Sequence, residues 1–298
     1  MLGETTKRIM SAIVLIGAVI VALGVDTFDR VLILVFIEIF ALLALNEIFT
    51  LSRRDENQKP HVIPGYIFGT LIILSFYGQL LSQMPGELSG PGTLLVSIFY
   101  PGNNLTVPLL IFYLFGAGVV QLLSRPLSGT LYSLGVTLLA LCYAVLPLAH
   151  VFLYLTLSSG IFYLVLIVVI TVLTDSGGYF CGRWFGKHKV GIKASPNKTY
   201  EGYLGGIFTA LLLTPVFVGV YTHYFDSGLD FGGFKLIIFT LVTSTITILA
   251  DLIESAIKRD AGQKDSGRTI PGHGGVLDLV DSMLFTIPVG YYLLLVFR

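Results

Sequence analysis

Residues 31–51 read VLILVFIEIFALLALNEIFTL, an apolar run whose only ionisable side chains are Glu38 and Glu47. A helix of about 20 such residues crosses the ~30 Å hydrocarbon core of a bilayer. The run therefore predicts a transmembrane helix. An unpaired carboxylate at Glu38 would cost about 3 kcal/mol at that depth, so we expect this side chain to have a structural partner.

Apolar runs of similar length recur along the whole chain. Nine candidate spans lie at 9–25, 31–51, 62–81, 106–124, 129–149, 158–175, 203–225, 234–257 and 276–297. Hydrophobic residues make up 54% of the chain and charged residues only 12%, against roughly 25% charged in soluble domains. The first run imitates a signal peptide, but the many later spans favour a retained first helix. The sequence predicts an all-α, polytopic integral membrane protein.

The Lys and Arg residues predict its orientation. With the N-terminus inside, 15 of the 18 fall on one side, and only Arg30, Lys235 and Arg298 fall on the other. Because cytoplasmic loops are rich in these residues, we expect a cytoplasmic N-terminus and a C-terminus on the opposite side. A bacterial inner (cell) membrane is the expected location. The net charge of zero gives no general attraction to nucleic acid.

Polar residues are concentrated in the second half of the chain. We therefore divide it into an N-terminal transmembrane region, 1–157, with about five spans, and a C-terminal catalytic region, 158–298, with about four spans. The short run Thr93–Tyr100 cannot span and is expected to be an interfacial element.

The first polar segment begins at Asp175, which is expected to end an apolar helix before two glycines that let the backbone bend. Ser195-Pro196 suits an N-cap and first turn, so the next helix is expected to begin there. Helix-start residues and cytoplasmic cations would explain much of this segment without a site. Gly182 and Gly186 do not form a P-loop, and their spacing could equally serve helix packing.

The second polar segment is harder to explain by structure alone. Asp251, Glu254, Ser255 and Lys258 fall on one face of a helix, at the cytoplasmic end of a span. A last helix is expected to open with two carboxylates, again three residues apart on one face. Carboxylates and cations beside a glycine turn suggest that the segment binds a hard cation and phosphate.

These motifs resemble those of the CDP-diacylglycerol synthases, or phosphatidate cytidylyltransferases. The second segment carries Ser255-x2-Lys258-Arg259-x4-Lys264-Asp265-x-Gly267-x2-Ile270-Pro271-x-His273-Gly274-Gly275-x2-Asp278-x2-Asp281. The first carries Ser195-Pro196-Asn197-Lys198-Thr199-x-Glu201-Gly202, similar to a second block of that family. The close resemblance covers 174–206 and 251–282.

The resemblance implies roles for particular residues. The implied catalytic residues are Asp251, Asp278, Asp281, Lys258, Lys264 and Asp265. The implied substrate- and phosphate-binding residues are Ser195, Lys198, Thr199, Glu201, Ser255, Arg259, Arg268, His273, Gly274 and Gly275. The implied metal ligands are Asp251, Asp278, Asp281 and Glu254, with Asp175 and Glu201 orienting the cluster.

The implied reaction transfers a cytidylyl group from CTP to phosphatidate, giving CDP-diacylglycerol and pyrophosphate. The reaction would use Mg²⁺, and a second cation stays open. Separately, the glycine-rich helices would allow a homodimer. One departure is Leu279, where the family usually has an arginine after the aspartate. We hypothesise that Arg268 partly replaces that charge, which an unchanged activity in Arg268→Ala would refute.

Three alternatives remain open at this point. The same fold could serve another lipid phosphate, or the chain could be a non-catalytic member of the family. Membrane carboxylates also mark the ion pathways of transporters. Charges gathered at one membrane face, instead of near the midplane, argue against a transporter.

Overall fold

The computed structural model divides the chain into two compact units, each of which is described by itself. Unit 1 comprises Met1–Thr156 and Asp265–Leu279, and unit 2 comprises Leu157–Lys264 and Val280–Arg298. The structure describes the chain except for residues 1–3, 25–27, 55–56, 85–87, 226–228, 230 and 298, and it leaves out the side chains of residues 4–9, 12 and 28. The side chains of the predicted cytoplasmic cations Lys7 and Arg8, and the whole of Arg298, therefore lie outside what is described.

The fold is all-α, as predicted, with no β-strand among the described residues. Eight helical segments of the described chain are long and apolar enough to cross a membrane. These segments are Val31–Leu51, Val62–Ser82, Thr106–Ser124, Thr130–Tyr154, Gly160–Phe185, Tyr200–Phe225, Gly233–Asp260 and Val276–Phe297. The run at 9–25 forms most of α1 (Glu4–Gly24), whose apolar part, Ile13–Gly24, is shorter than a span, so the count of nine is not confirmed.

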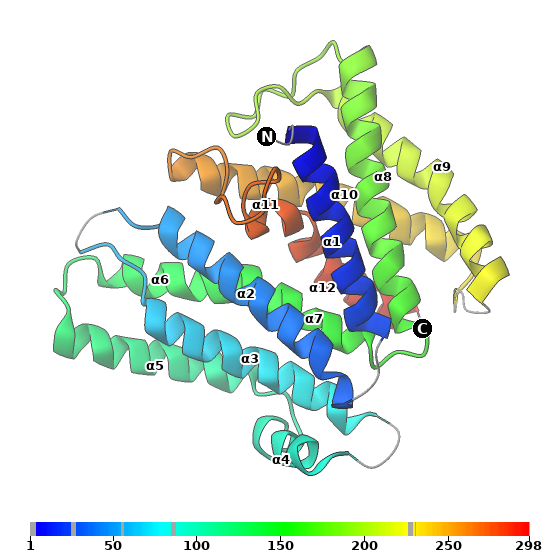
Figure 1. Cartoon of the computed structure of the whole chain (residues 1–298). Coiled ribbons are helices and arrows are strands. Elements are labelled where there is room, and N and C mark those ends of the chain that lie inside the picture. Colours follow the sequence, from blue (N-terminus) through cyan, green and yellow to red (C-terminus); the bar gives the residue numbers. More distant parts are fainter. Residues whose placement is uncertain are drawn as a thin grey trace. The chain divides into compact units, whose positions relative to one another are not determined.

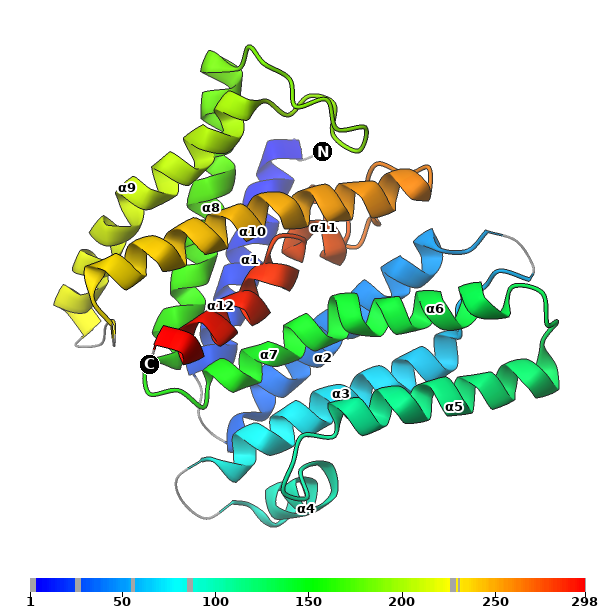
Figure 2. The same cartoon turned by 180° about the vertical axis from the view of Figure 1, so that it is seen from behind.

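Unit 1 is built around α3 (Val62–Ser82), which packs against α2 (Val31–Leu51), α5 (Thr106–Ser124) and α7 (Leu146–Tyr154) (Figures 1 and 2). A π-helical turn, Leu141–Val145, joins α6 (Thr130–Ala140) to α7 without ending the helix. The short run expected at Thr93–Tyr100 forms α4 (Gly90–Phe99), which is too short to span.

The expected partner of Glu38 is present. The hydroxyl of Thr70 on α3 donates to Glu38 Oε1 at 2.5 Å. This hydrogen bond joins two spanning helices and gives the carboxylate a polar neighbour inside an apolar bundle. The pairing agrees with the structural role predicted for Glu38.

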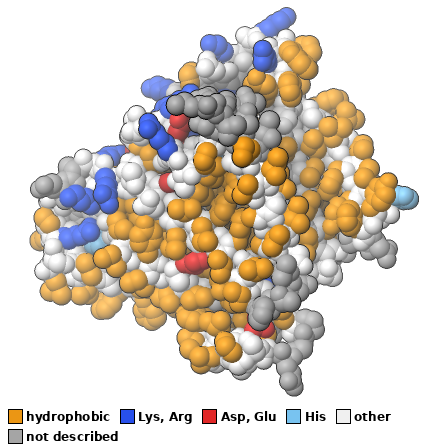
Figure 3. Space-filling model, viewed as in Figure 1, with side chains coloured by type: hydrophobic (Ala, Val, Ile, Leu, Met, Phe, Trp, Pro, Cys, Tyr) orange, Lys and Arg blue, Asp and Glu red, His pale blue; other side chains and the backbone are white. Residues whose placement is uncertain are grey.

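The surface of unit 1 has the distribution expected of a membrane protein. Its helices expose large apolar side chains, such as Leu123 at 78% and Leu131 at 89%. Lys and Arg side chains instead gather where α2 connects to α3 and α5 connects to α6 (Figure 3). Water would disfavour so much exposed hydrocarbon, so the protein is an integral membrane protein.

Unit 2 contains α8 (Gly160–Phe185), α9 (Tyr200–Phe225), α10 (Gly233–Asp260) and α12 (Met283–Phe297). Helices α8 and α9 are in close contact through glycines. A Cβ atom at Gly206 would lie 2.5 Å from the backbone oxygen of Thr174, and one at Gly202 would lie 3.0 Å from that of Gly178. Residues without side chains let the two backbones approach.

Two expectations about this region are wrong. Helix α8 does not end at Asp175 but continues ten residues further to Phe185, because the glycines pack against α9 instead of bending the chain. Helix α9 begins at Tyr200 and not at Ser195-Pro196. Its N-terminus is capped by Thr199, whose hydroxyl accepts a hydrogen bond from the backbone N–H of Gly202 at 3.1 Å.

The last helix also differs from its prediction. It is interrupted between α11 (Val276–Val280) and α12, with Asp281 at the break, where its Oδ1 accepts a hydrogen bond from the backbone N–H of Ser282 at 2.5 Å. Asp278 and Asp281 therefore do not share one face of a continuous helix. The unpaired N–H groups at the start of α12 explain why a carboxylate is placed there.

Candidate active site

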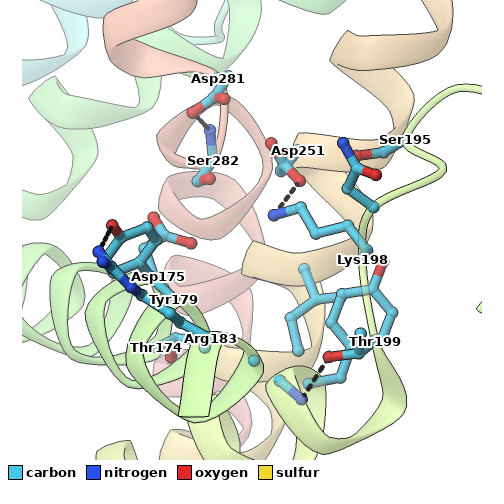
Figure 4. Close-up of a pocket in the computed structure, with 16 residues that line it drawn as sticks. Thr174, Asp175, Tyr179, Arg183, Ser195, Lys198, Thr199, Asp251, Asp281 and Ser282 are labelled. Atoms are coloured by element: carbon cyan, nitrogen blue, oxygen red, sulfur yellow. Dashed lines mark hydrogen bonds and ion pairs between the residues drawn. The ribbon is translucent and has the colours of Figure 1, made fainter. Parts of the chain in front are cut away.

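Unit 2 contains a polar pocket of about 560 Å³ (Figure 4). Its lining comes from five parts of the unit: helix α8, the connection 186–199, the first turn of α9, the C-terminal half of α10 and the residues just before α12. The lining residues are Thr174, Asp175, Gly178, Tyr179, Gly182, Arg183, Ser195, Asn197, Lys198, Thr199, Gly202, Tyr203, Ile248, Asp251, Asp281 and Ser282. Six of the residues with a predicted role, Asp175, Ser195, Lys198, Thr199, Asp251 and Asp281, thus line one cavity.

The central interaction is an ion pair between Lys198 Nζ and Asp251 Oδ2, 3.0 Å apart. Burial lowers the pKa of Lys198, but the attraction and hydrogen bond of Asp251 and the charge of Asp175 outweigh it and raise this pKa above its ordinary value. Lys198 is therefore cationic at neutral pH. Its side chain is still 43% exposed, so an incoming anion can reach it.

Short-range bonds in the connection to α9 hold Lys198 in place. The backbone N–H of Val190 donates to the carbonyl of Lys198 at 3.0 Å, and the N–H of Tyr200 donates to that of His188 at 3.0 Å. Glu201 accepts hydrogen bonds from the backbone N–H of His188 at 3.2 Å and pairs with its imidazole at 2.5 Å. Glu201 therefore supports the connection and does not line the pocket.

The pocket carboxylates do not by themselves form a closed metal site. No three His, Cys, Asp or Glu side chains of the described chain are grouped closely enough to hold a metal ion. Asp175, Asp251 and Asp281 nevertheless line the same cavity. Mg²⁺ is usually bound by one or two carboxylates together with waters and substrate phosphates, so this arrangement fits a cation that arrives with a polyphosphate.

The remaining predicted residues of α10 and its C-terminal connection lie outside the pocket lining. Glu254 is fully buried and forms an ion pair with Lys258, one helical turn away. Arg259 donates to the carbonyl oxygens of Ala194 at 3.4 Å and Gln263 at 3.1 Å, which joins the end of α10 to the connection before α9. Ser255 and Lys264 do not line the pocket.

The other predicted residues belong to unit 1. Asp278 Oδ2 accepts hydrogen bonds from the backbone N–H groups of Ser266 and Gly275, each at 2.8 Å, and from the Ser266 hydroxyl at 2.9 Å. Gly274 has φ +99°, a left-handed conformation that favours glycine. The turn is thereby folded around the Asp278 carboxylate.

Three more predicted residues lie in or beside this turn. Asp265 and Arg268 are exposed. His273 Nδ1 lies 3.0 Å from the hydroxyl of Ser11 on α1, so its ring is held by the first helix.

Sequence reasoning missed several residues of the unit 2 pocket and of the unit 1 turn around Asp278. Tyr179 and Arg183 line the pocket, and the Arg183 guanidinium donates to the Tyr179 hydroxyl at 3.0 Å. Their four-residue spacing on a helix was the available signal. Asn197 and Tyr203 also line the pocket. In unit 1, Glu47 was visible as a carboxylate in an apolar run, but nothing in the sequence indicated what it contacts.

A set of apolar spanning helices with a pocket that combines carboxylates and lysine at the helix ends defines a polytopic membrane enzyme. The model of the Cytidylyltransferase family matches residues 6–297. The chain belongs to this family.

Curated bacterial proteins named phosphatidate cytidylyltransferase are similar to the chain. The one from Staphylococcus saprophyticus is 33% identical over 208 residues, which cover 70% of this chain and 78% of that protein. The one from Staphylococcus aureus (strain COL) is 31% identical over 231 residues, covering 75% and 86%. The one from Haemophilus influenzae is 43% identical over 133 residues, covering 45% and 46%.

Proposed function

We propose that this protein transfers a cytidylyl group from CTP to phosphatidate, forming CDP-diacylglycerol and pyrophosphate. The observation that carries the proposal is the pocket of unit 2, where Lys198 and three carboxylates line one cavity in a membrane enzyme. The names of the similar bacterial proteins support the same substrates.

The pocket suits the chemistry of this transfer. A phosphate oxygen of phosphatidate forms a bond to the α-phosphorus of CTP, and the bond from that phosphorus to the oxygen bridging to the β-phosphate breaks. Pyrophosphate leaves with the electron pair. The attacking phosphate is already anionic near pH 7, because the second pKa of a phosphomonoester is about 6. The protein must therefore supply charge neutralisation and in-line positioning, and it needs no nucleophile of its own.

We assign the phosphate contacts first to Lys198, Thr199 and Ser195, which line the pocket. Asp251 holds the Lys198 ammonium where a triphosphate would meet it. The cations Lys258, Arg259 and Lys264 are proposed to raise the positive potential at the end of α10, and Glu254 to hold Lys258. In unit 1, Asp265 is proposed as a catalytic residue. The proposed phosphate-binding residues of this unit are Arg268, His273, Gly274 and Gly275.

A divalent cation, Mg²⁺ in this proposal, would be held in unit 2 by Asp251 and Asp281 of the pocket. Asp278 of unit 1 stays a cation ligand predicted from the resemblance. When bound, the cation neutralises phosphate charge at the reacting centre. The other ligands would be phosphate oxygens and water, consistent with carboxylates that do not converge on one point. A second cation is compatible with the same carboxylates.

We further propose that the protein lies in a bacterial inner membrane with its N-terminus in the cytoplasm. CTP then reaches the pocket from the water phase, and the lipid phosphate reaches it from the bilayer. The distribution of Lys and Arg supports this orientation. A homodimer stays a prediction.

The test uses the purified full chain in detergent with Mg²⁺, phosphatidate and CTP labelled at either the α- or the γ-phosphate. We expect label from α-labelled CTP in the lipid, one pyrophosphate released per lipid, and no lipid label from γ-labelled CTP. Lipid label from the γ-position alone would indicate a kinase. Product with only another lipid phosphate would change the acceptor, and no product from folded protein would contradict the proposal.

A further inference from the structure

Glu47, near the end of α2, is a buried carboxylate surrounded by hydrogen-bond donors. Only 4% of the residue is exposed. Its Oε1 accepts from the Thr269 hydroxyl at 2.7 Å and from the backbone N–H of Val276 at 2.8 Å. Its Oε2 accepts from the Ser266 hydroxyl at 2.9 Å and from the backbone N–H of Leu277 at 2.8 Å. All four donors belong to the segment 265–279, which we call the site loop.

The site loop is shaped around this carboxylate. A Cβ atom at Gly275 would lie 2.3 Å from Glu47 Oε2, and one at Gly267 would lie 2.9 Å from Oε1. Both distances are too short for real atoms, so a side chain at either position would displace the loop or Glu47. Two glycines thus allow the loop backbone to approach a side chain more than 200 residues away in the sequence.

Ser266 connects Glu47 to Asp278. The Ser266 hydroxyl oxygen lies 2.9 Å from Glu47 Oε2 and 2.9 Å from Asp278 Oδ2. One hydroxyl hydrogen serves both carboxylates, and the backbone N–H of Ser266 also donates to Asp278 at 2.8 Å. A displacement of Ser266 therefore moves donors of both carboxylates.

The chemistry of Glu47 matters as much as its shape. An ionised carboxylate only accepts hydrogen bonds, which suits a site with four donors. A glutamine of the same shape would direct its NH₂ group at two of those donors and leave them without an acceptor. Glu38, on the same helix, instead accepts a hydrogen bond from the Thr70 hydroxyl on α3, so it provides a matched comparison.

We propose that Glu47 is a positioning residue of this enzyme, which from α2 fixes the site loop and, through Ser266, the carboxylate of Asp278. The inference rests on the proposed function, because it takes Asp278 to be a cation ligand in the proposed reaction. Glu47 itself touches no reacting atom in this account. It holds the loop that carries the proposed cation ligand.

The test compares Glu47→Gln with Glu38→Gln in the full chain in detergent. Lys264 and Arg268 are exposed and offer tryptic sites at the start of the site loop and within it. Because a hydrogen bond to a charged group strongly limits local opening, we expect cleavage after Arg268 to be about tenfold faster, or more, in Glu47→Gln. We also expect the Mg²⁺ concentration for half-maximal activity to rise about 10- to 100-fold. Glu38→Gln should match the wild type in both.

The outcomes separate this inference from the proposed function. An inactive wild type would overturn the proposed function, while the cleavage rates would still decide whether Glu47 holds the loop. An active wild type with Glu47→Gln equal to Glu38→Gln would overturn the inference alone. Faster cleavage of Glu47→Gln with an unchanged Mg²⁺ requirement would show that Glu47 holds the site loop without positioning Asp278, and would overturn its positioning role.

A second variant covers the case in which Glu47→Gln does not fold. Thr269→Val removes one of the four donors and keeps the side-chain shape. We expect smaller changes in the same directions, with cleavage and Mg²⁺ requirement both raised. A Thr269→Val protein identical to the wild type in both measurements would contradict the proposal.

Discussion

Lys198 and Asp251 form an ion pair that suits the proposed site, because that site has to bind a polyanion. Their ion pair, at 3.0 Å, keeps the ammonium charged and directed into the pocket before substrate binds. In the proposed reaction, an arriving triphosphate would pair with the ammonium, and the released carboxylate would then be available to a cation. In this proposal Lys198 would bind the nucleotide and Asp251 would then bind the cation.

We expect Lys198→Ala to raise the KM for CTP by about tenfold or more, because a charge-assisted contact to phosphate is lost. Lys193→Ala, an exposed lysine of the same connection, is the control and should leave KM unchanged. Steady-state kinetics at fixed phosphatidate provides the measurement. Equal KM values for the two variants would remove Lys198 from the phosphate site.

The pH dependence follows from the same pair. The pKa of Lys198 is raised above its ordinary value of 10.5. Its contribution to stability is therefore complete below pH 10.5 and is lost only as the pH rises through the higher folded-state pKa. The ratio of the KM for CTP of Lys198→Ala to that of the wild type should consequently stay constant from about pH 7 to 9, and a ratio that falls toward one in that range would contradict a charged Lys198.

At this scale the sequence predicted charged residues better than their partners. Asp251 and Asp281 could be singled out because carboxylates are rare in apolar runs, and Lys198 because it belongs to a motif that carries the resemblance. The contact between Lys198 and Asp251 could not be predicted, because Lys198 lies on the connection before α9 and Asp251 on α10, and only tertiary packing brings the two together. Glu47 shows the same limit: its type and depth were visible, but its four donors come from a distant loop.

At the scale of elements, the α8–α9 contact determines where the pocket residues lie. Gly206 Cα approaches α8 so closely that no side chain fits against the carbonyl of Thr174. The first turn of α9 carries the pocket residues Gly202 and Tyr203, and Thr199 caps it. Moving α9 away from α8 would therefore open the pocket.

We expect Gly206→Ala to destabilise the protein by about 1–3 kcal/mol, as overpacking does in other cores, and to lower activity. Gly219→Ala, also on α9, is the matched control because a Cβ there meets nothing within 4 Å. Thermal unfolding in detergent and specific activity are the measurements. A Gly206→Ala protein as stable and active as Gly219→Ala would show that the close contact is not required.

The elements that were predicted well are those with strong apolar periodicity or length. Eight of the nine spans coincide with helices that can cross a membrane. The errors fall at polar helix ends. Ser195-Pro196 is a good cap by type, yet α9 starts at Tyr200, because Thr199 caps it and the preceding backbone pairs with the segment around His188. Local propensity could not show that pairing.

At the scale of the whole molecule, the charge asymmetry predicts a single orientation in the membrane. In a background with Cys142 and Cys181 replaced by alanine, we expect Lys193→Cys to react with a membrane-impermeant thiol reagent only after the cells are permeabilised. Asn103→Cys, in the exposed connection between α4 and α5, should react in intact cells. The reverse pattern would invert the proposed topology.

The central claim is that the pocket carboxylates support Mg²⁺-dependent cytidylyl transfer to phosphatidate. The most direct measurement follows α-labelled CTP into lipid with and without Mg²⁺, for the wild type, Asp251→Asn and the control Asp260→Asn at the exposed end of the same helix. We predict Mg²⁺-dependent CDP-diacylglycerol from the wild type and Asp260→Asn, and at least about 100-fold less from folded Asp251→Asn. Full activity in Asp251→Asn, or product formation that ignores Mg²⁺ removal, would contradict the account.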